Sequence, residues 1–352
     1  VLEAAGRIGG RALTIHQSEL GGGLFEMGAI WLHSAEQNPL VPIAKARGES
    51  LLRAEDLRRK ITFVGTRPAN AAEIADFDGA WARFEAAADA LLASGHPDVP
   101  LAAVARSLPD DPWAATIEAW EGPVICAVDA DAYSLADWRT NELHGSNLVP
   151  ECGIGTFITR LAEGLDVRLD TPATRVRWGT QVAVETARGT IIASSCIVTA
   201  STGALNAGMI AFDPPLPPDV QDCLHDLPMG LAMKVALRAT GPDRLDLPPR
   251  CSVDHRVERA GDALMPFQCW PFGRDYVQGW IGGSAAWTLA KQGEAAAVDF
   301  ALDQLRDLFG SRVNRLFAGG PRLVTHWDAD PFIRGAYAYA LPGHADAREH
   351  LG

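Results

Sequence analysis

The first eleven residues constrain the fold of this chain more than any other stretch. Residues 1–11 read VLEAAGRIGGR, a short apolar run that ends in Glu3 and leads into a glycine-rich turn and an arginine. In a dinucleotide-binding fold, such an acidic residue stands at a strand end beside a ribose hydroxyl, about 20 residues after a G-x-G-x-x-G turn. The chain begins after the position of that turn. The opening therefore predicts the ribose-binding half of a nucleotide site, compatible with NAD or FAD.

Length, charge and cysteine usage narrow the class of protein. A chain of 352 residues predicts two domains, or one large domain with insertions. The net charge of −13 argues against nucleic acid as a partner. Polar residues interrupt the most apolar window, 191–210, so we expect no membrane span. Six cysteines without CxxC or metal-ligand spacing indicate free thiols, no zinc site and a cytoplasmic location, although a targeting segment before Val1 stays open.

The spacing of apolar residues divides the chain into a helical and a strand-rich part. Residues 49–150 are expected to be mainly helical, and β-branched residues become frequent after Gly153. Helices are predicted at 38–48, 70–95, 111–120, around 157–161 and at 295–309, and strands at 167–169, 174–178, 182–186, 190–199, 231–239 and 324–327.

Lys234 is the strongest single candidate for a functional side chain. It stands between Met233 and Val235 in the predicted buried strand 231–239. Burying an ammonium group is costly unless the group is paired or hydrogen-bonded. A lysine at such a position therefore indicates a site, the alternative being a lysine at a sheet edge whose end reaches water.

Five blocks of the sequence together resemble the flavin-containing amine oxidase family, which includes monoamine oxidases, polyamine oxidases and flavin-dependent histone lysine demethylases. The blocks occur in the family's order and span nearly the whole chain. They are LEAAGRIGGR at 2–11, GAIWLHS at 28–34, LDTPATRVRW at 169–178, MGLAMKVAL at 229–237 and HWDADPFIRGAYAY at 326–339.

The resemblance implies an α/β fold with two parts. One is a Rossmann-like FAD-binding domain made of 1–48, 151–225 and 320–352, here lacking the first strand and the GxGxxG loop. The other is a discontinuous α+β substrate domain of mixed sheet plus helices, made of 49–150 and 226–319. Family members continue beyond both ends of this sequence, so the resemblance implies a chain truncated at both ends.

The resemblance also implies which residues bind FAD. Glu3 would accept hydrogen bonds from the ribose, Gly9 and Gly10 would let the backbone approach the cofactor, and Arg11 would offer a charged fork near phosphate. Because Ala336 stands where covalently flavinylated members carry cysteine, non-covalent FAD is expected. The remaining cofactor contacts are Gly28, Ala29, Ile30 and Trp31 beside the ring system, Ala173 at the adenine and Trp327 at the flavin face.

Three residues receive roles in the reaction. Lys234 matches a lysine that holds a water against the flavin N5 atom, and Tyr337 matches one aromatic wall around the amine. His33 matches a substrate-facing histidine of several polyamine oxidases, although a lone histidine is more often a structural hydrogen-bonding group. No metal is required.

The function implied is that of an FAD-dependent amine oxidase. Hydride would pass from a C–N bond to flavin N5, and O2 would reoxidise the flavin, giving an imine or aldehyde and H2O2. The partners would be a small-molecule amine and O2, without nucleic acid or membrane, and the oligomeric state stays open. Two alternatives remain: an incomplete, non-catalytic remnant, colourless when purified, or a related flavoprotein that oxidises amino acids or carbon–carbon bonds.

Overall fold

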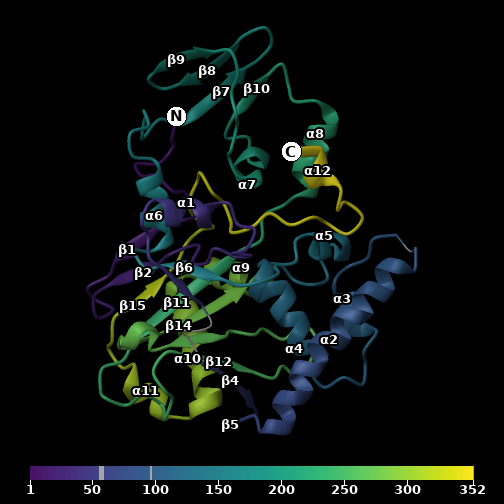
Figure 1. Ribbon diagram of the computed structural model, residues 1–352, viewed down its shortest axis with the longest axis vertical. Helices are drawn as coiled ribbons and strands as arrows, with labels where there is room; N and C mark the ends of the chain where they lie inside the picture. The colour runs from purple at the N-terminus through teal and green to yellow at the C-terminus, as the bar shows by residue number, and fades with distance from the viewer. Residues whose placement is uncertain (55–58, 96, 352) are drawn as a thin grey trace.

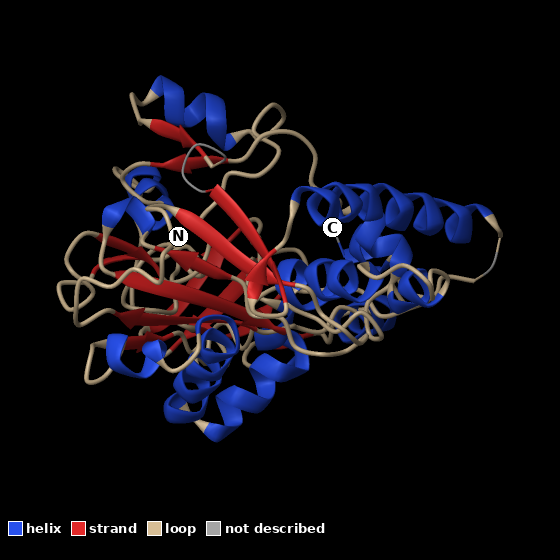
Figure 2. Cartoon of the chain, turned by 90° about the horizontal axis from the view of Figure 1, so that it is seen from below, coloured by secondary structure: helices blue, strands red, loops and turns tan. Residues whose placement is uncertain are grey.

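The computed structural model describes residues 1–54, 59–95 and 97–351 of the chain. Figure 1 shows a large sheet in one half of the molecule and a smaller sheet at the opposite end, next to the N-terminus. Helices surround the central strands on several sides, as Figure 2 shows. None of the helices in these ranges is long and apolar enough to cross a membrane.

The largest sheet has seven strands in the order β15-β11-β14-β13-β12-β4-β5. Neighbours are antiparallel except β12 and β4, which run parallel. Strands β11 and β14 pair along their whole length and form one of its longest ladders. The strands are β4 (Arg59–Val64), β5 (Arg67–Pro68), β11 (Ala232–Arg238), β12 (Cys251–His255), β13 (Phe267–Cys269), β14 (Tyr276–Gly282) and β15 (Arg322–Val324).

Three smaller sheets complete the strand content of the described residues. A four-stranded sheet in the order β10-β7-β8-β9 lies at the top of Figure 1, and its β10 and β7 are parallel. The two-stranded sheets are β1-β2 and β3-β6. The bounds are β1 (Thr14–His16), β2 (Leu24–Glu26), β3 (Leu51–Arg53), β6 (Leu148–Pro150), β7 (Ala173–Arg177), β8 (Val182–Thr186), β9 (Gly189–Ala193) and β10 (Ala211–Asp213).

Helices fill the segments between these strands, and two of them are irregular. The π-helix η2 (Trp120–Cys126) directly continues α4, and η3 (Pro271–Gly273) is a short 3-10 turn. The α-helices are α1 (Leu40–Ala46), α2 (Ala71–Ala93), α3 (Ala102–Arg106), α4 (Ala114–Ala119), α5 (Leu135–Thr140), α6 (Ile154–Leu161), α7 (Thr202–Asn206), α8 (Pro218–Asp226), α9 (Gly283–Gln292), α10 (Glu294–Phe309), α11 (Arg312–Leu316) and α12 (Ala347–Leu351).

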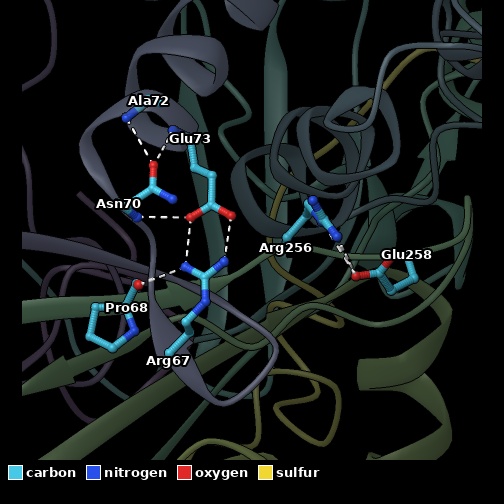
Figure 3. A network of polar contacts seen from close by, with 7 residues as sticks. All are labelled: Arg67, Pro68, Asn70, Ala72, Glu73, Arg256 and Glu258. Carbon is cyan, nitrogen blue, oxygen red and sulfur yellow. Dashed lines mark hydrogen bonds and ion pairs between the residues drawn. The ribbon is translucent and has the colours of Figure 1, made fainter.

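Helix α2 confirms the prediction for 70–95 and shows why it begins where it does. The side chain of Asn70 accepts from the backbone N–H of Ala72 and Glu73, and Glu73 accepts from the N–H of Asn70 in return. This reciprocal cap satisfies N–H groups that have no partner inside the helix. Arg67 adds two hydrogen bonds of 2.7 Å to Glu73 (Figure 3).

Three strand predictions are wrong in extent. Residues 167–169 form only a single parallel bridge, Leu2↔Arg168. Strand β9 ends at Ala193, so the predicted strand 190–199 is too long, and Ile197 is 89% exposed. A strand forms only where a neighbouring strand accepts and donates its backbone hydrogen bonds, and the alternation of side chains does not show whether such a neighbour exists. The last strand, predicted at 324–327, ends at Val324. Beyond it, the Thr325 hydroxyl accepts the Lys234 N–H, and the Thr325 N–H donates to the Lys234 oxygen.

The two largest apolar clusters of the described residues lie in different parts of the chain. The larger packs the seven-stranded sheet against α9 and α10, and the second joins α2 to α5. The predicted division into an FAD-binding and a substrate domain stays a prediction. Strand β15, from the range 320–352, pairs with β11 from the range 226–319, so one sheet spans both predicted domains.

Candidate active site

Lys234 lies at the middle of strand β11 and is 1% exposed, which confirms its predicted burial. Its ammonium Nζ donates to the backbone oxygens of Glu26, at 2.6 Å, and Gly28, at 2.5 Å. Burial lowers the pKa of Lys234 to about 7, and the nearby Glu26 carboxylate opposes that shift. The side chain therefore titrates near neutral pH, in the range where a proton donor or acceptor is most useful.

The two carbonyls that hold Lys234 belong to a backbone segment that runs beside residues 11–13. The N–H of Met27 donates to Leu13, and the N–H of Ala29 donates to Arg11. A Cβ atom at Gly28 would stand 1.8 Å from the oxygen of Arg11, so only glycine fits there. The sequence blocks 2–11 and 28–34 are thus in direct contact.

Arg11 also links this contact to the backbone next to Tyr337. The guanidinium of Arg11 donates to the backbone oxygen of Ala336, the residue before Tyr337. Burial lowers the pKa of Arg11 and raises the pKa of Tyr337 to about 12. Tyr337 nevertheless keeps 40% of its surface exposed. The Tyr337 side chain therefore borders accessible space next to the backbone that Arg11 binds.

Trp327 joins the C-terminal block to the same segment. Its side chain is 8% exposed, and its Nε1 donates to the oxygen of Met27 at 3.1 Å. The guanidinium carbon of Arg7 lies 5.9 Å from the ring centroid, while Arg7 also donates to the oxygen of Gly10 at 2.7 Å. The glycine turn, Trp327 and the 27–28 backbone therefore meet at one place.

Glu3 and Ala173, assigned to the adenosine end, lie apart from that cluster but near each other. The N–H of Glu3 donates to Arg168 at 2.9 Å, and its carboxylate accepts the N–H of Ala5 at 2.8 Å. Ala173 begins β7 and packs, together with Leu2, against the apolar core of the four-stranded sheet. The structure thus brings the predicted cofactor residues together in two groups.

The remaining predicted residues follow Gly28 in the chain. Ala29 is exposed, whereas Ile30, Trp31 and His33 are partly buried. His33 Nδ1 lies 2.7 Å from Asn147 Oδ1, beside the bridge that joins the 31–35 segment to β6. This hydrogen bond gives His33 a structural partner.

Two residues of the site were missed by the sequence analysis. The Glu26 carboxylate accepts from Thr14 Oγ1 at 2.8 Å and from the N–H of Ile154 at 2.7 Å, and burial raises its pKa. The ring of Trp280 lies 5.3 Å from Lys234 Nζ. In the sequence, Glu26 is a carboxylate two residues before Gly28, and Trp280 is a tryptophan inside the apolar strand β14. Neither position indicates a site on its own, because each residue approaches Lys234 only through long-range pairing.

The residues present fit a bound dinucleotide. Arg11 and Tyr337 are exposed, and Gly9 adopts a φ of +105°, with a Cβ there meeting the oxygen of Ala12 at 2.4 Å. A carboxylate, a glycine turn and a guanidinium are the groups that ribose and phosphate require. The ranges that the structure describes hold no group of three or more His, Cys, Asp or Glu placed for a metal ion.

The fold is that of the flavin amine oxidases, which confirms the predicted class. The chain resembles putrescine oxidase bound to putrescine with a TM-score of 0.74, over 99% of this chain and 83% of that one, at 18% identity. The family model described as flavin containing amine oxidoreductase matches residues 1–351. The chain therefore belongs to the flavin-containing amine oxidoreductase family, as its sequence blocks predicted, and membership implies a flavin cofactor.

Curated proteins similar to this chain include polyamine oxidases and a histone demethylase homolog. A probable polyamine oxidase 4 of Arabidopsis thaliana is 29% identical over 97% of this chain and 72% of its own length. Polyamine oxidase 4 of Oryza sativa subsp. japonica is 26% identical over 97% of this chain and 74% of its own. A lysine-specific histone demethylase 1 homolog 3 of Arabidopsis thaliana matches 62% of this chain, at 27% identity, with 14% of its own length.

Proposed function

We propose that this protein is an FAD-dependent amine oxidase that oxidises the C–N bond of a small amine with O2. The observation that carries the proposal is the fully buried ammonium of Lys234, which two backbone oxygens hold. It lies near the glycine turn, whose Arg11 binds the backbone of Ala336 next to Tyr337. The polyamine oxidases among the relatives, and the putrescine-bound neighbour, favour a di- or polyamine as substrate.

The proposed cofactor contacts follow the two groups of residues in the site. Glu3 and Ala173 would hold the adenosine end, Gly9, Gly10 and Arg11 the phosphates. Residues 28–31 and Trp327 would lie along the ring system. Binding would be non-covalent, because Ala336 offers no thiol for a thioether bond. When bound, the flavin supplies the acceptor for the hydride of the substrate carbon, and O2 then takes the electrons to give H2O2.

The side chains of this chain would orient the amine and manage protons. Tyr337, with a pKa raised to about 12, keeps a neutral phenol over the whole physiological range and presents a ring face to the amine. Lys234, with a pKa lowered to about 7, holds or releases a proton at neutral pH. His33 is proposed to face the substrate.

The decisive experiment measures flavin and peroxide on the same protein. The purified chain is incubated with FAD, dialysed and scanned for flavin absorbance, and then denatured to test whether the flavin is released into solution. Peroxide release is followed with mono-, di- and polyamines and with amino acids. Bound, releasable flavin and amine-dependent peroxide support the proposal. A colourless protein after reconstitution, or peroxide formed only with amino acids, contradicts it.

A further inference from the structure

Trp280 stands directly opposite Lys234 in the centre of the large sheet. The register of β11 and β14 pairs Lys234 with Trp280, and directly opposed residues of an antiparallel pair point to the same face. Lys234 Nζ lies 5.3 Å from the centroid of the Trp280 ring. This is within the distance of about 6 Å at which an aromatic face attracts an ammonium group.

The indole of Trp280 is itself held in place. Its Nε1 donates to the backbone oxygen of Val124 at 2.7 Å, inside the π-helix η2. Two residues further along β14, a Cβ atom at Gly282 would stand 1.8 Å from the oxygen of Pro123, so strand and π-helix are in backbone contact. The ring plane is therefore fixed by a hydrogen bond to one neighbour while its face is turned to another.

The same side chain also touches the segment that carries Tyr337. Trp280 packs against the small apolar cluster of Ala127, Ala232 and Ala336, and Ala336 directly precedes Tyr337. Replacing Trp280 would therefore disturb its contacts with Lys234, with η2 and with the 336–337 backbone together. Among the described residues, no other aromatic ring makes a cation–π contact with Lys234.

We propose that Trp280 is a positioning residue of the reaction site, whose ring holds the Lys234 ammonium against the oxygens of Glu26 and Gly28 and favours its charged form. The inference rests on the proposed function, which gives Lys234 its role. Among the described residues, the Trp280 ring from β14 lies against the Lys234 ammonium, and the Glu26 carboxylate from β2 acts on its charge. Burial favours the neutral amine, and these two groups oppose it.

The test reads the protonation of Lys234 directly by NMR, without turnover. The chain has four lysines, Lys45, Lys60, Lys234 and Lys291, so selective lysine labelling gives four side-chain signals, and Lys234→Met identifies the relevant one. Trp280→Leu removes the ring, and Trp280→Phe keeps a smaller ring face without the N–H donor. Trp120→Leu is the matched control, because Trp120 lies 5.5 Å from Lys60 Nζ.

Trp280→Leu is expected to lower the pKa of Lys234 by about one unit, a tenfold change in its protonation equilibrium. Trp280→Phe should lower the pKa of Lys234 less, and Trp120→Leu should leave the pKa of Lys234 unchanged. If Trp280→Leu and Trp280→Phe both fold and the Lys234 pKa is unchanged or raised, the inference is overturned. Because the readout needs neither flavin nor amine, it decides the role of Trp280 separately from the peroxide assay that decides the proposed function.

Discussion

The ammonium nitrogen of Lys234 lies 2.5 Å from the carbonyl oxygen of Gly28, so a glycine backbone is the direct partner of a buried cation. The nearest carboxylate, that of Glu26, is engaged by Thr14 and by the N–H of Ile154 at the start of α6. A carbonyl orients the ammonium without neutralising it. The orientation of the Lys234 ammonium is therefore set by the backbone of Glu26 and Gly28.

Replacing Lys234 with methionine should impair the reaction and spare the fold. Methionine fills a similar volume without a buried charge, so we expect stability to be kept or raised. Loss of the ammonium should slow flavin reduction or reoxidation on the order of 100-fold, the typical cost of removing one preorganised donor. Stopped-flow spectroscopy of both half-reactions measures this. Lys291→Met, at an exposed position of α9, is the control, and equal rates in both variants would remove Lys234 from the mechanism.

Replacing Gly28 with alanine should destabilise the protein by about 2 kcal/mol, as overpacking of a rigid contact does. The new methyl group would stand 1.8 Å from the Arg11 oxygen, and both backbones would have to separate. Thermal unfolding measures the effect. Gly241→Ala is matched to it, because a Cβ there meets nothing within 4 Å. Similar melting temperatures for the two variants would show that the 11–13 and 27–29 segments are not tightly held.

The sequence was sufficient for the features that depend on local pattern. The spacing of apolar residues predicted the helix at 70–95, and the apolar neighbours of Lys234 predicted its burial. Features that depend on pairing between segments distant in the sequence could not be predicted. Trp280 is placed opposite Lys234 by the register of β14 with β11. Ile197 lies outside any strand despite its apolar neighbours in the sequence, because no described strand pairs with it. Local propensity does not contain that information.

Glu118 should make stability fall as the pH rises. It is 6% exposed, its Oε2 atom has no hydrogen-bond partner, and burial raises its pKa from 4.5 to about 7. The unfolded chain gives up this proton near pH 4.5, so between pH 4.5 and 7 unfolding releases a proton. The stabilisation is complete below pH 4.5 and lost above pH 7, at most about 3 kcal/mol.

Glu118→Gln tests this by urea unfolding at several pH values. The variant should be more stable than the natural chain at pH 8 and should lose part of the decline between pH 4.5 and 7. Part of the decline will remain, because burial raises the pKa of Glu121 to about 7 as well. Glu151→Gln, at an exposed position, should keep the full slope. An unchanged slope in Glu118→Gln would assign the pH dependence elsewhere.

Asp137 and Arg348 tie the end of the described chain to helix α5. The Asp137 carboxylate is 1% exposed and accepts two hydrogen bonds from Arg348, at 2.5 and 2.9 Å, and one from the N–H of Ala340. Arg348 also donates to the oxygen of Ala338, the residue after Tyr337. The pair therefore holds the backbone that presents the Tyr337 ring.

Asp137→Asn should weaken this tie, because the amide is uncharged and its NH2 group cannot accept from Arg348 or Ala340. We expect a loss of about 2 kcal/mol in the free energy of unfolding, the usual value for hydrogen bonds to a buried charged group. Since Tyr337 borders the amine path in the proposed function, KM for the amine should rise more than kcat falls. Asp262→Asn, in an exposed pair with Arg259, should change stability by less than about 0.5 kcal/mol. Equal stability of the two variants would mean that the 337–340 backbone is held by its pairing with Gly230 and Pro228 instead.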